Sequence, residues 1–311
     1  SQSMKIAYCM LYTGNNFDEV AKTIDYLISK GDHVFVMIND DDTRDNIFLS
    51  FADDAELHIS NRQQIALPAD LSLPRGQLYQ IMDAQSYSDE AEFEFDYFIT
   101  LTDGMLPIVS KEAMDAFLTS LNGKDVYYVK SDTNTDKELK SRVEEYSFFT
   151  NSYDFQKSKL IRAMNTATAK VCKPFKKRKI ENDDTVYLTY PWFIISNASA
   201  KLLAENMYYC STNFKMCLYP EELAIGTMLK KYVPDNHINK NVWVAGKNGD
   251  YTFCAPVEEV TMDTIQKYPD ALFAAKLIAS EKEDEKTLYD ELVTRYNPDN
   301  DYELVNPEND K

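Results

Sequence analysis

The chain has 311 residues and carries 33 basic against 51 acidic side chains, which gives a formal net charge of −18. This charge repels a phosphate backbone and argues against nucleic acid as a partner, so a phosphorylated small molecule needs a local basic pocket. The five cysteines are widely spaced without a CxxC pair, which signals neither a disulfide framework nor a zinc site and is typical of reduced cytosolic thiols.

Ser1-Gln2-Ser3 is typical of a cleavage scar ahead of Met4, and an apolar run follows at once over residues 5–11. No run approaches the ~20 apolar residues that cross a bilayer. We therefore expect a cytoplasmic protein, and leave open a peripheral contact with the inner face of the membrane.

The first forty residues predict a parallel strand-helix-strand unit. Residues 5–11 form a buried strand, residues 17–29 carry apolar side chains at helical spacing with Asn16 as the N-cap, and residues 33–38 are β-branched and aromatic. Loops after such strands gather at the carboxyl edge of the sheet, where open α/β folds bind ligands.

The next segment predicts a loop over Pro68 to Pro74, a helix over 78–86 and a buried strand over 97–101. That strand ends at Thr102-Asp103-Gly104. The loop from Thr102 to Pro107 is therefore a site candidate by position.

The remaining chain alternates strands and helices around a polar stretch at 131–185, which carries a basic run at 173–179. The patterns predict helices at 113–121 (capped by Ser110), 198–205, 221–232 and within 278–296, strands at 125–129, 192–195, 243–245 and 252–255, and a frayed tail at 297–311. We expect one catalytic domain over 4–296, with a nucleotide-binding half at about 4–130 and an acceptor and diphosphate half at about 131–296.

Five segments in this order resemble the core-2/I-branching β-1,6-N-acetylglucosaminyltransferase family. They are residues 6–8, residues 95–102 leading to 106–108, residues 192–196, residues 219–227 and residues 272–277. Each motif is short, and their order across residues 5–290 carries the resemblance. It implies a GT-A-type (Rossmann-like) mixed sheet flanked by helices, and an inverting, metal-independent transfer from a UDP-sugar by a divergent bacterial member.

An inverting transfer needs one carboxylate to take the proton of the acceptor hydroxyl. The resemblance places Glu222 at the family's catalytic glutamate, with Glu221 beside it to orient it or to bind the acceptor. The alternative is structural, because acidic residues after Pro220 also favour the first turn of a helix.

The departing diphosphate needs positive charge, which metal-dependent enzymes of this fold supply through an Asp-x-Asp pair. Here Asp103 stands alone, so we expect no cofactor and assign the charge to Lys276, which matches the family's basic residue. Lys240 and, alternatively, Lys247 are candidates for a second cation. A snorkelling Lys276 and a manganese ion held by Asp103 are the competing interpretations.

Loop residues after the predicted strands are the candidates for contact with the nucleotide. They are Tyr12, Thr13, Gly14, Asn39, Asp40, Arg75, Asp103 and Gly104. Asp40-Asp41-Asp42 is better explained as a solvated strand end than as a metal site. Arg75 and Met105 depart from the family pattern, which shows a tryptophan and an acid at these places.

Acceptor or sugar contacts are predicted for Trp192, Glu144 and Glu145, although Trp192 is equally a core residue. The basic run 173–179 is a solvated loop, a lid or a membrane contact. The three histidines, His33, His58 and His237, have no sequence spacing typical of a metal site or of a nucleophile dyad.

The leading hypothesis is a glycosyltransferase that moves a sugar, N-acetylglucosamine by resemblance, to a hydroxyl of a polysaccharide, glycolipid or glycoprotein. Alternatives are a metal-dependent transferase using Asp103, and a non-catalytic relative that binds a nucleotide sugar or a glycan.

Overall fold

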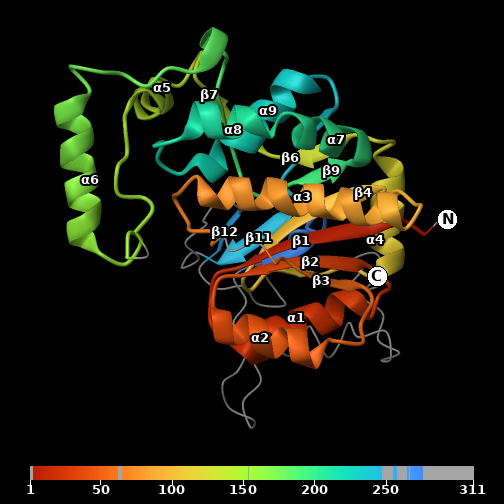
Figure 1. Ribbon diagram of the computed structural model, residues 1–311. Coiled ribbons are helices and arrows are strands. Elements are labelled where there is room, and N and C mark those ends of the chain that lie inside the picture. The colour runs from red at the N-terminus through yellow and green to blue at the C-terminus, as the bar shows by residue number, and fades with distance from the viewer. Residues whose placement is uncertain are drawn as a thin grey trace.

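The computed structural model describes residues 3–61, 65–152, 154–246, 255–257, 265 and 267–275. Its central feature is a seven-stranded mixed sheet in the order β10-β6-β9-β4-β1-β2-β3 (Figure 1). These strands are β1 (Ile6–Tyr12), β2 (His33–Ile38), β3 (Leu57–Ile59), β4 (Tyr97–Thr102), β6 (Asp125–Tyr127), β9 (Ile194–Ser196) and β10 (His237–Asn239). Strands β3, β2, β1 and β4 run parallel, whereas β9 runs antiparallel to both β4 and β6. The order β3-β2-β1-β4 is that of half a doubly wound sheet.

Helices cover both faces of this sheet, with α3 on one side and α1 and α2 on the other (Figure 1). The helices of the main body are α1 (Phe17–Ile28), α2 (Asp41–Ser50), α3 (Ser72–Glu90), α4 (Lys111–Ser120), α7 (Asn197–Glu205), α8 (Met207–Phe214) and α9 (Ala224–Tyr232). Alternate residues of β1 point to opposite faces, as the strand period of two requires. Tyr8 and Met10 pack in the core that contains α1, and Cys9 packs in the core that contains α3. This confirms the predicted single α/β domain with a mixed sheet flanked by helices.

Two helices begin at the capping residues that the sequence predicts. The side chain of Asn16 accepts from the Glu19 amide and begins α1, and Ser110 begins α4 in the same way. The interpretation of Asp40 to Asp42 as a strand end was incomplete. Asp40 caps helix α2. The sequence did not predict this helix, because its Phe48 and Leu49 are exposed and do not fit one apolar face.

Helix α3 corrects the predicted loop over Pro68 to Pro74, because the helix begins at Ser72. Pro74 lies in the first turn, where a missing N–H costs nothing. Gly76 then lets α3 approach β1 and β2 closely, since an added Cβ would lie 3.4 Å from both Leu11 Cδ2 and Met37 Sδ.

Two small sheets complete the fold. Strands β12-β11-β13-β5 form one, and β7-β8 forms the other. Their bounds are β5 (Leu106–Pro107), β7 (Val129–Asp132), β8 (Tyr187–Thr189), β11 (Trp243–Gly246), β12 (Ala255–Val257) and β13 (Phe273–Ala275). The strand predicted at 125–129 is therefore divided between β6 and β7. The helix predicted at 221–232 is likewise a short 3-10 turn, η2 (Pro220–Glu222), followed by α9.

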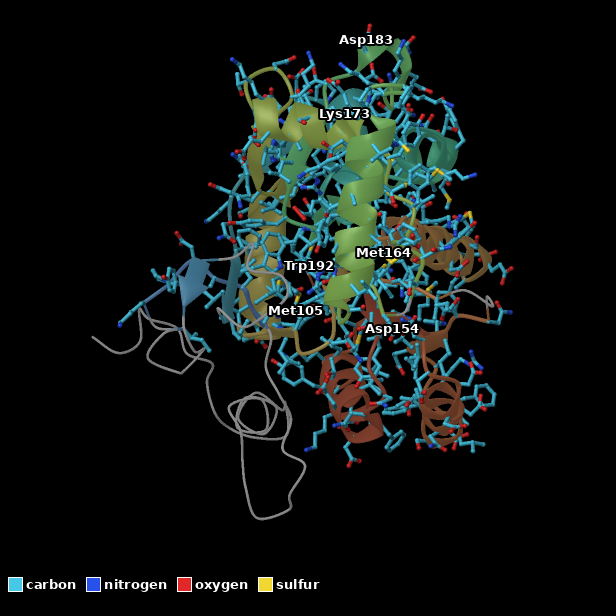
Figure 2. All side chains as sticks on the ribbon, turned by 90° about the vertical axis from the view of Figure 1, so that its left-hand side faces the viewer. Met105, Asp154, Met164, Lys173, Asp183 and Trp192 are labelled. Atoms are coloured by element: carbon cyan, nitrogen blue, oxygen red, sulfur yellow. The ribbon has the colours of Figure 1, made fainter. Side chains whose placement is uncertain are left out.

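The polar stretch 131–185 contains α5 (Lys137–Glu144), α6 (Lys159–Cys172) and the 3-10 turn η1 (Glu181–Asp183). Helix α6 stands apart from the main body at the left of Figure 1 and crosses in front of the sheet in Figure 2. No helix in the described ranges is long and apolar enough to cross a membrane. The predicted helix within 278–296 and the tail at 297–311 lie outside the described residues, and the proposed halves of the domain stay predictions.

Candidate functional site

A cavity of about 580 Å³ lies where β1 and β2 end. It is lined by Thr13, Gly14, Asn15, Asn39, Asp40, Asp41, Asp42 and Lys157. Because carboxyl ends of neighbouring parallel strands meet at one edge, the loop after β1 and the start of α2 face the same space. The structure thus brings together four of the predicted nucleotide contacts: Thr13, Gly14, Asn39 and Asp40.

Asp103 organises the loop that follows β1. Its Oδ1 accepts from the Thr13 backbone N–H at 2.8 Å, and its Oδ2 accepts from the Thr13 hydroxyl at 2.9 Å. Gly14 fits tightly here, since an added Cβ would lie 3.0 Å from Tyr12 Oη and 3.2 Å from Asp103 Oδ2. Gly104 turns the chain away with a φ of 68°. Burial raises the pKa of Asp103, and the hydrogen bonds from Thr13 oppose that rise.

Two of the predicted nucleotide contacts, Tyr12 and Asn39, form hydrogen bonds that hold the neighbouring loops. Tyr12 is buried, and its hydroxyl donates to the Asn16 carbonyl and accepts from the Asn16 amide. Tyr12 therefore closes the turn after β1 and offers no free phenol to a ligand. The side-chain amide of Asn39 donates to the Ala66 carbonyl at 2.8 Å and accepts from the Ala66 amide at 3.0 Å, so it anchors the following loop.

Asp40 presents a carboxylate at the end of β2. Its Oδ2 accepts from the Thr43 amide at 3.0 Å and from the Thr43 hydroxyl at 2.7 Å. These hydrogen bonds lower the pKa of Asp40, so this edge of the cavity stays negatively charged. The opposite oxygen, Oδ1, is the atom available to a ligand hydroxyl.

Lys157 is the cation among the described residues that line this cavity, and no strand end or motif in the sequence predicted it. Its side chain is exposed and forms no ion pair with any described residue. The signal in the sequence was charge, because residues 155–180 hold nine Lys and Arg and no Asp or Glu. The chain path before α6 brings this lysine to the cavity that Thr13 and Asp40 also line.

Glu221 and Glu222 lie on the turn η2, against the loop that precedes α3. Glu221 is fully buried and its Oε2 accepts from the Ala69 amide at 2.9 Å. Glu222 is 7% exposed, with Arg142 Nη1 at 3.6 Å from its Oε2. Burial raises the pKa of both carboxyls, and Arg142 opposes the rise at Glu222. Of the two, Glu222 is the carboxylate with an exposed edge.

Arg142 also fixes the backbone of this turn. It donates to the Leu218 carbonyl and to the Tyr219 carbonyl at 2.9 Å. Tyr219 has a φ of 50°, a left-handed conformation that costs about 1 kcal/mol or more for a residue with a Cβ. Contacts from Arg142 therefore hold a strained turn next to the carboxylate of Glu222.

A short piece of chain joins the cavity to this turn. Ala66 is bonded to Asn39, which lines the cavity, and Ala69 is bonded to Glu221. Only two residues lie between the two alanines, so their Cα atoms are at most about 11 Å apart. The Asp40 cavity and the Glu222 turn are thus neighbouring parts of one region.

The predicted diphosphate ligands are not gathered at this cavity by the described residues. Lys240 lies 3.9 Å from Asp270 Oδ1 and over the ring of Phe117, and it does not line the cavity. Lys276 and Lys247 lie outside the described residues. Arg75 lies on α3, close enough to Cys210 of α8 to affect the pKa of its thiol, and it does not line the cavity either.

The residues predicted to contact the acceptor have other partners in the structure. Trp192 is 1% exposed in the core, so its indole offers no face to a sugar. Glu144 and Glu145 form ion pairs with Lys177 and Lys173 at 3.3 and 3.5 Å. Their carboxylates therefore attach the basic run to α5. Within the described ranges, no group of three or more His, Cys, Asp or Glu side chains is placed to hold a metal ion.

Comparisons with known proteins show no family for the chain. No protein-family model and no curated protein matches it. A solved structure of a UDP-glucose pyrophosphorylase variant from Leishmania major with UDP-glucose is 12% identical over 91% of this chain and 68% of its own, with a TM-score of 0.36. UDP-glucose phosphorylase from Trypanosoma brucei is 9% identical over 74% of this chain and 62% of its own, with a TM-score of 0.34. These likenesses are too distant to carry an argument about this chain.

Proposed function

We propose that the chain is a glycosyltransferase that uses a nucleoside-diphosphate sugar, with Glu222 as the base that deprotonates the acceptor hydroxyl. The observation that carries the proposal is the connection, through residues 66–69 and Glu221, between the strand-end cavity and the turn η2 that also carries Glu222. A transferase needs a donor site and a base in one region, so that both can act on the same acceptor hydroxyl.

The nucleoside is proposed to occupy the ends of β1 and β2. An acidic side chain after the second strand of a Rossmann-like unit binds ribose hydroxyls, and Asp40 stands at this place. Lys157, which lines the same cavity, would contact the diphosphate. The three aspartates at 40–42 suit hydroxyl and N–H donors, so they favour the sugar-and-base portion of the ligand over its phosphates.

Glu222 has the environment that a general base needs. Its raised pKa makes it a stronger base than an exposed glutamate, and Arg142 keeps it oriented. Glu221 is proposed to position the turn, because it is fully buried and bonded to Ala69. Of the two roles expected for Glu221, orienting Glu222 or binding the acceptor, its burial favours the first.

The finer features of the proposal are supported by the family resemblance alone. They are UDP-N-acetylglucosamine as donor, inversion at the anomeric carbon, independence of a metal, Lys276 on the diphosphate, and a glycan, glycolipid or glycoprotein acceptor. Asp103 as a manganese ligand is the competing arrangement. Both of its oxygens already accept hydrogen bonds from Thr13, so a metal would have to share them.

UDP release from a panel of UDP-sugars, with and without EDTA, tests the reaction. We expect activity that survives EDTA and falls about 10²–10⁴-fold in Glu222→Gln. Glu138→Gln, an exposed acid on α5, is the control and keeps its activity. Loss of activity with EDTA would mean that a metal at Asp103, and not a lysine, stabilises the departing diphosphate. UDP binding by the wild type without turnover would favour a binding protein.

The pH dependence of kcat/KM gives a second check on Glu222. The base must be ionised to accept a proton, and its pKa is raised by burial. The rate should therefore fall as the pH drops through that raised value, at a higher pH than an ordinary glutamate would require. A profile that stays flat down to about pH 4.3, the pKa of an exposed glutamate, would contradict the assignment.

A further inference from the structure

The segment of residues 155–180 has a charge opposite to that of the rest of the molecule. It contains nine Lys and Arg and no acidic residue, whereas the whole chain has a net charge of −18. Helix α6 forms most of this segment and stands apart from the sheet and its flanking helices (Figure 1). A concentrated positive patch on an acidic protein can attract an anionic surface that the remaining surface repels.

Apolar side chains line the outer face of this helix. Leu160, Met164 and Val171 are 70%, 45% and 66% exposed, and Phe175 just beyond the helix is 87% exposed. The three helical residues recur at spacings of four and seven, so they share one face. Asn165 and Ala169 on the opposite face are buried.

The stripe is bordered by positive charge. Lys159 and Lys170 lie beside it on the exposed surface of α6, and Lys176 and Lys177 flank Phe175. Figure 2 shows α6 in front of the sheet, with Met164 on the helix and Lys173 just beyond its end. Exposed apolar groups within a lysine border form the surface pattern of interfacial helices.

The polar contacts of the segment hold this face outward. The side chain of Asn165 accepts from the Phe148 and Phe149 amides at 3.0 and 3.3 Å. Arg178 is buried, and its guanidinium donates to the carbonyls of Val143, Asn213 and Lys215. These bonds attach the inner face of α6 and the end of the basic run to the body, which leaves the apolar stripe uncovered by described residues.

We propose that residues 155–180 dock the protein onto an anionic lipid bilayer, with α6 lying in the interface. Leu160, Val171 and Phe175 enter the acyl boundary, and the surrounding lysines bind acidic headgroups. The 14-residue helix is too short to span a bilayer, so it lies along the surface. A protruding helix edge fits a soft planar surface, whereas a protein partner requires a complementary groove.

Docking would also place the candidate site at the membrane. Lys157 lines the cavity and belongs to the docking segment. If the proposed transferase function holds, the acceptor is a lipid-linked glycan presented at the same surface. Membrane binding itself is independent of that function, and it is measured without any substrate.

Cosedimentation with vesicles tests the docking, using phosphatidylcholine alone and phosphatidylcholine with phosphatidylglycerol. We expect binding to the anionic vesicles only, weakened by salt, and reduced about tenfold or more by the triple variant Leu160→Ser, Val171→Ser, Phe175→Ser. All three side chains are exposed in the free protein, so the variant should keep its fold.

The chain supplies a matched control on α2. Phe48 and Leu49 are as exposed, at 62% and 72%, but they lie among aspartates, so their double serine variant should bind vesicles like the wild type. A Phe175→Trp variant should shift its fluorescence to the blue with anionic vesicles. The proposal would be overturned if the wild type did not bind anionic vesicles, or if both serine variants lost binding equally. It would also be overturned if the wild type were a dimer that the triple variant dissociates, because the apolar face would then belong to an interface with a second copy.

Discussion

Lys111 joins two carboxylates that the fold buries next to β1. Its Nζ lies 2.6 Å from Asp32 Oδ1 and 2.9 Å from Asp115 Oδ1, and Asp32 is 2% exposed. Burial raises the pKa of Asp32 to about 6 even though Lys111 opposes the rise. Desolvation is therefore the larger effect, and Lys111 offsets part of it.

We expect Lys111→Met to lower the free energy of unfolding by about 3–5 kcal/mol, because it leaves both carboxylates buried without their cation. Urea denaturation at pH 7 measures this loss. Lys124→Met, at an exposed position soon after α4, should change stability by no more than about 0.5 kcal/mol. Equal effects of the two substitutions would mean that the ion pairs contribute nothing particular.

Individual site residues were predictable by position but not by role. Thr13, Gly14, Asn39 and Asp40 follow predicted strands, and strand ends converge in space. Which polar atoms remain free depends on tertiary contacts, so the use of the Asn39 amide by Ala66 could not be predicted. Lys157 was missed because no strand precedes it.

Helix α9 and strand β8 meet at a position where only glycine fits. A Cβ on Gly226 would collide with the side chain of Thr189, whose hydroxyl donates to the Glu222 carbonyl at 3.2 Å. Close packing of α9 on β8 is thus directly connected to the turn that carries the proposed base. Any change at this contact displaces α9, Thr189 or the turn.

Gly226→Ala should therefore destabilise the protein by about 1–3 kcal/mol through overpacking. The double variant Gly226→Ala, Thr189→Ser removes the colliding methyl group and keeps the hydroxyl, so it should recover part of that loss. Thermal unfolding of the two single variants and the double variant gives the coupling energy. Strictly additive losses would show that the two residues do not collide.

At the level of elements, prediction succeeded where local signals agreed and failed where tertiary packing decided. Strands β1 and β4 are continuous apolar runs with clear ends, and Asn16 marks the start of α1. Helix α3 contains Pro74 and Gly76, which read locally as loop residues, yet it packs against β1 and β2. The small strand β13 is only three residues long and has too few residues to show a period.

In the whole molecule, one basic segment lies beside an otherwise acidic cavity at the ends of β1 and β2. The sequence indicated the basic run, but it did not indicate that the preceding lysine would face the ends of β1 and β2. The proposed donor site depends on this arrangement, because Asp40 and Lys157 are proposed to bind opposite ends of one nucleoside diphosphate. Glu222 then completes the site from the far end of the Ala66 to Ala69 connection.

Calorimetric titration of UDP into the wild type, Lys157→Ala and Lys159→Ala tests this arrangement most directly. Both lysines are exposed and two residues apart, but only Lys157 lines the cavity. We expect UDP to bind the wild type and Lys159→Ala equally, and Lys157→Ala about tenfold more weakly, as loss of a charge-assisted contact to phosphate requires. No binding of UDP, or equal binding by all three proteins, would contradict the assignment of the cavity as the donor site.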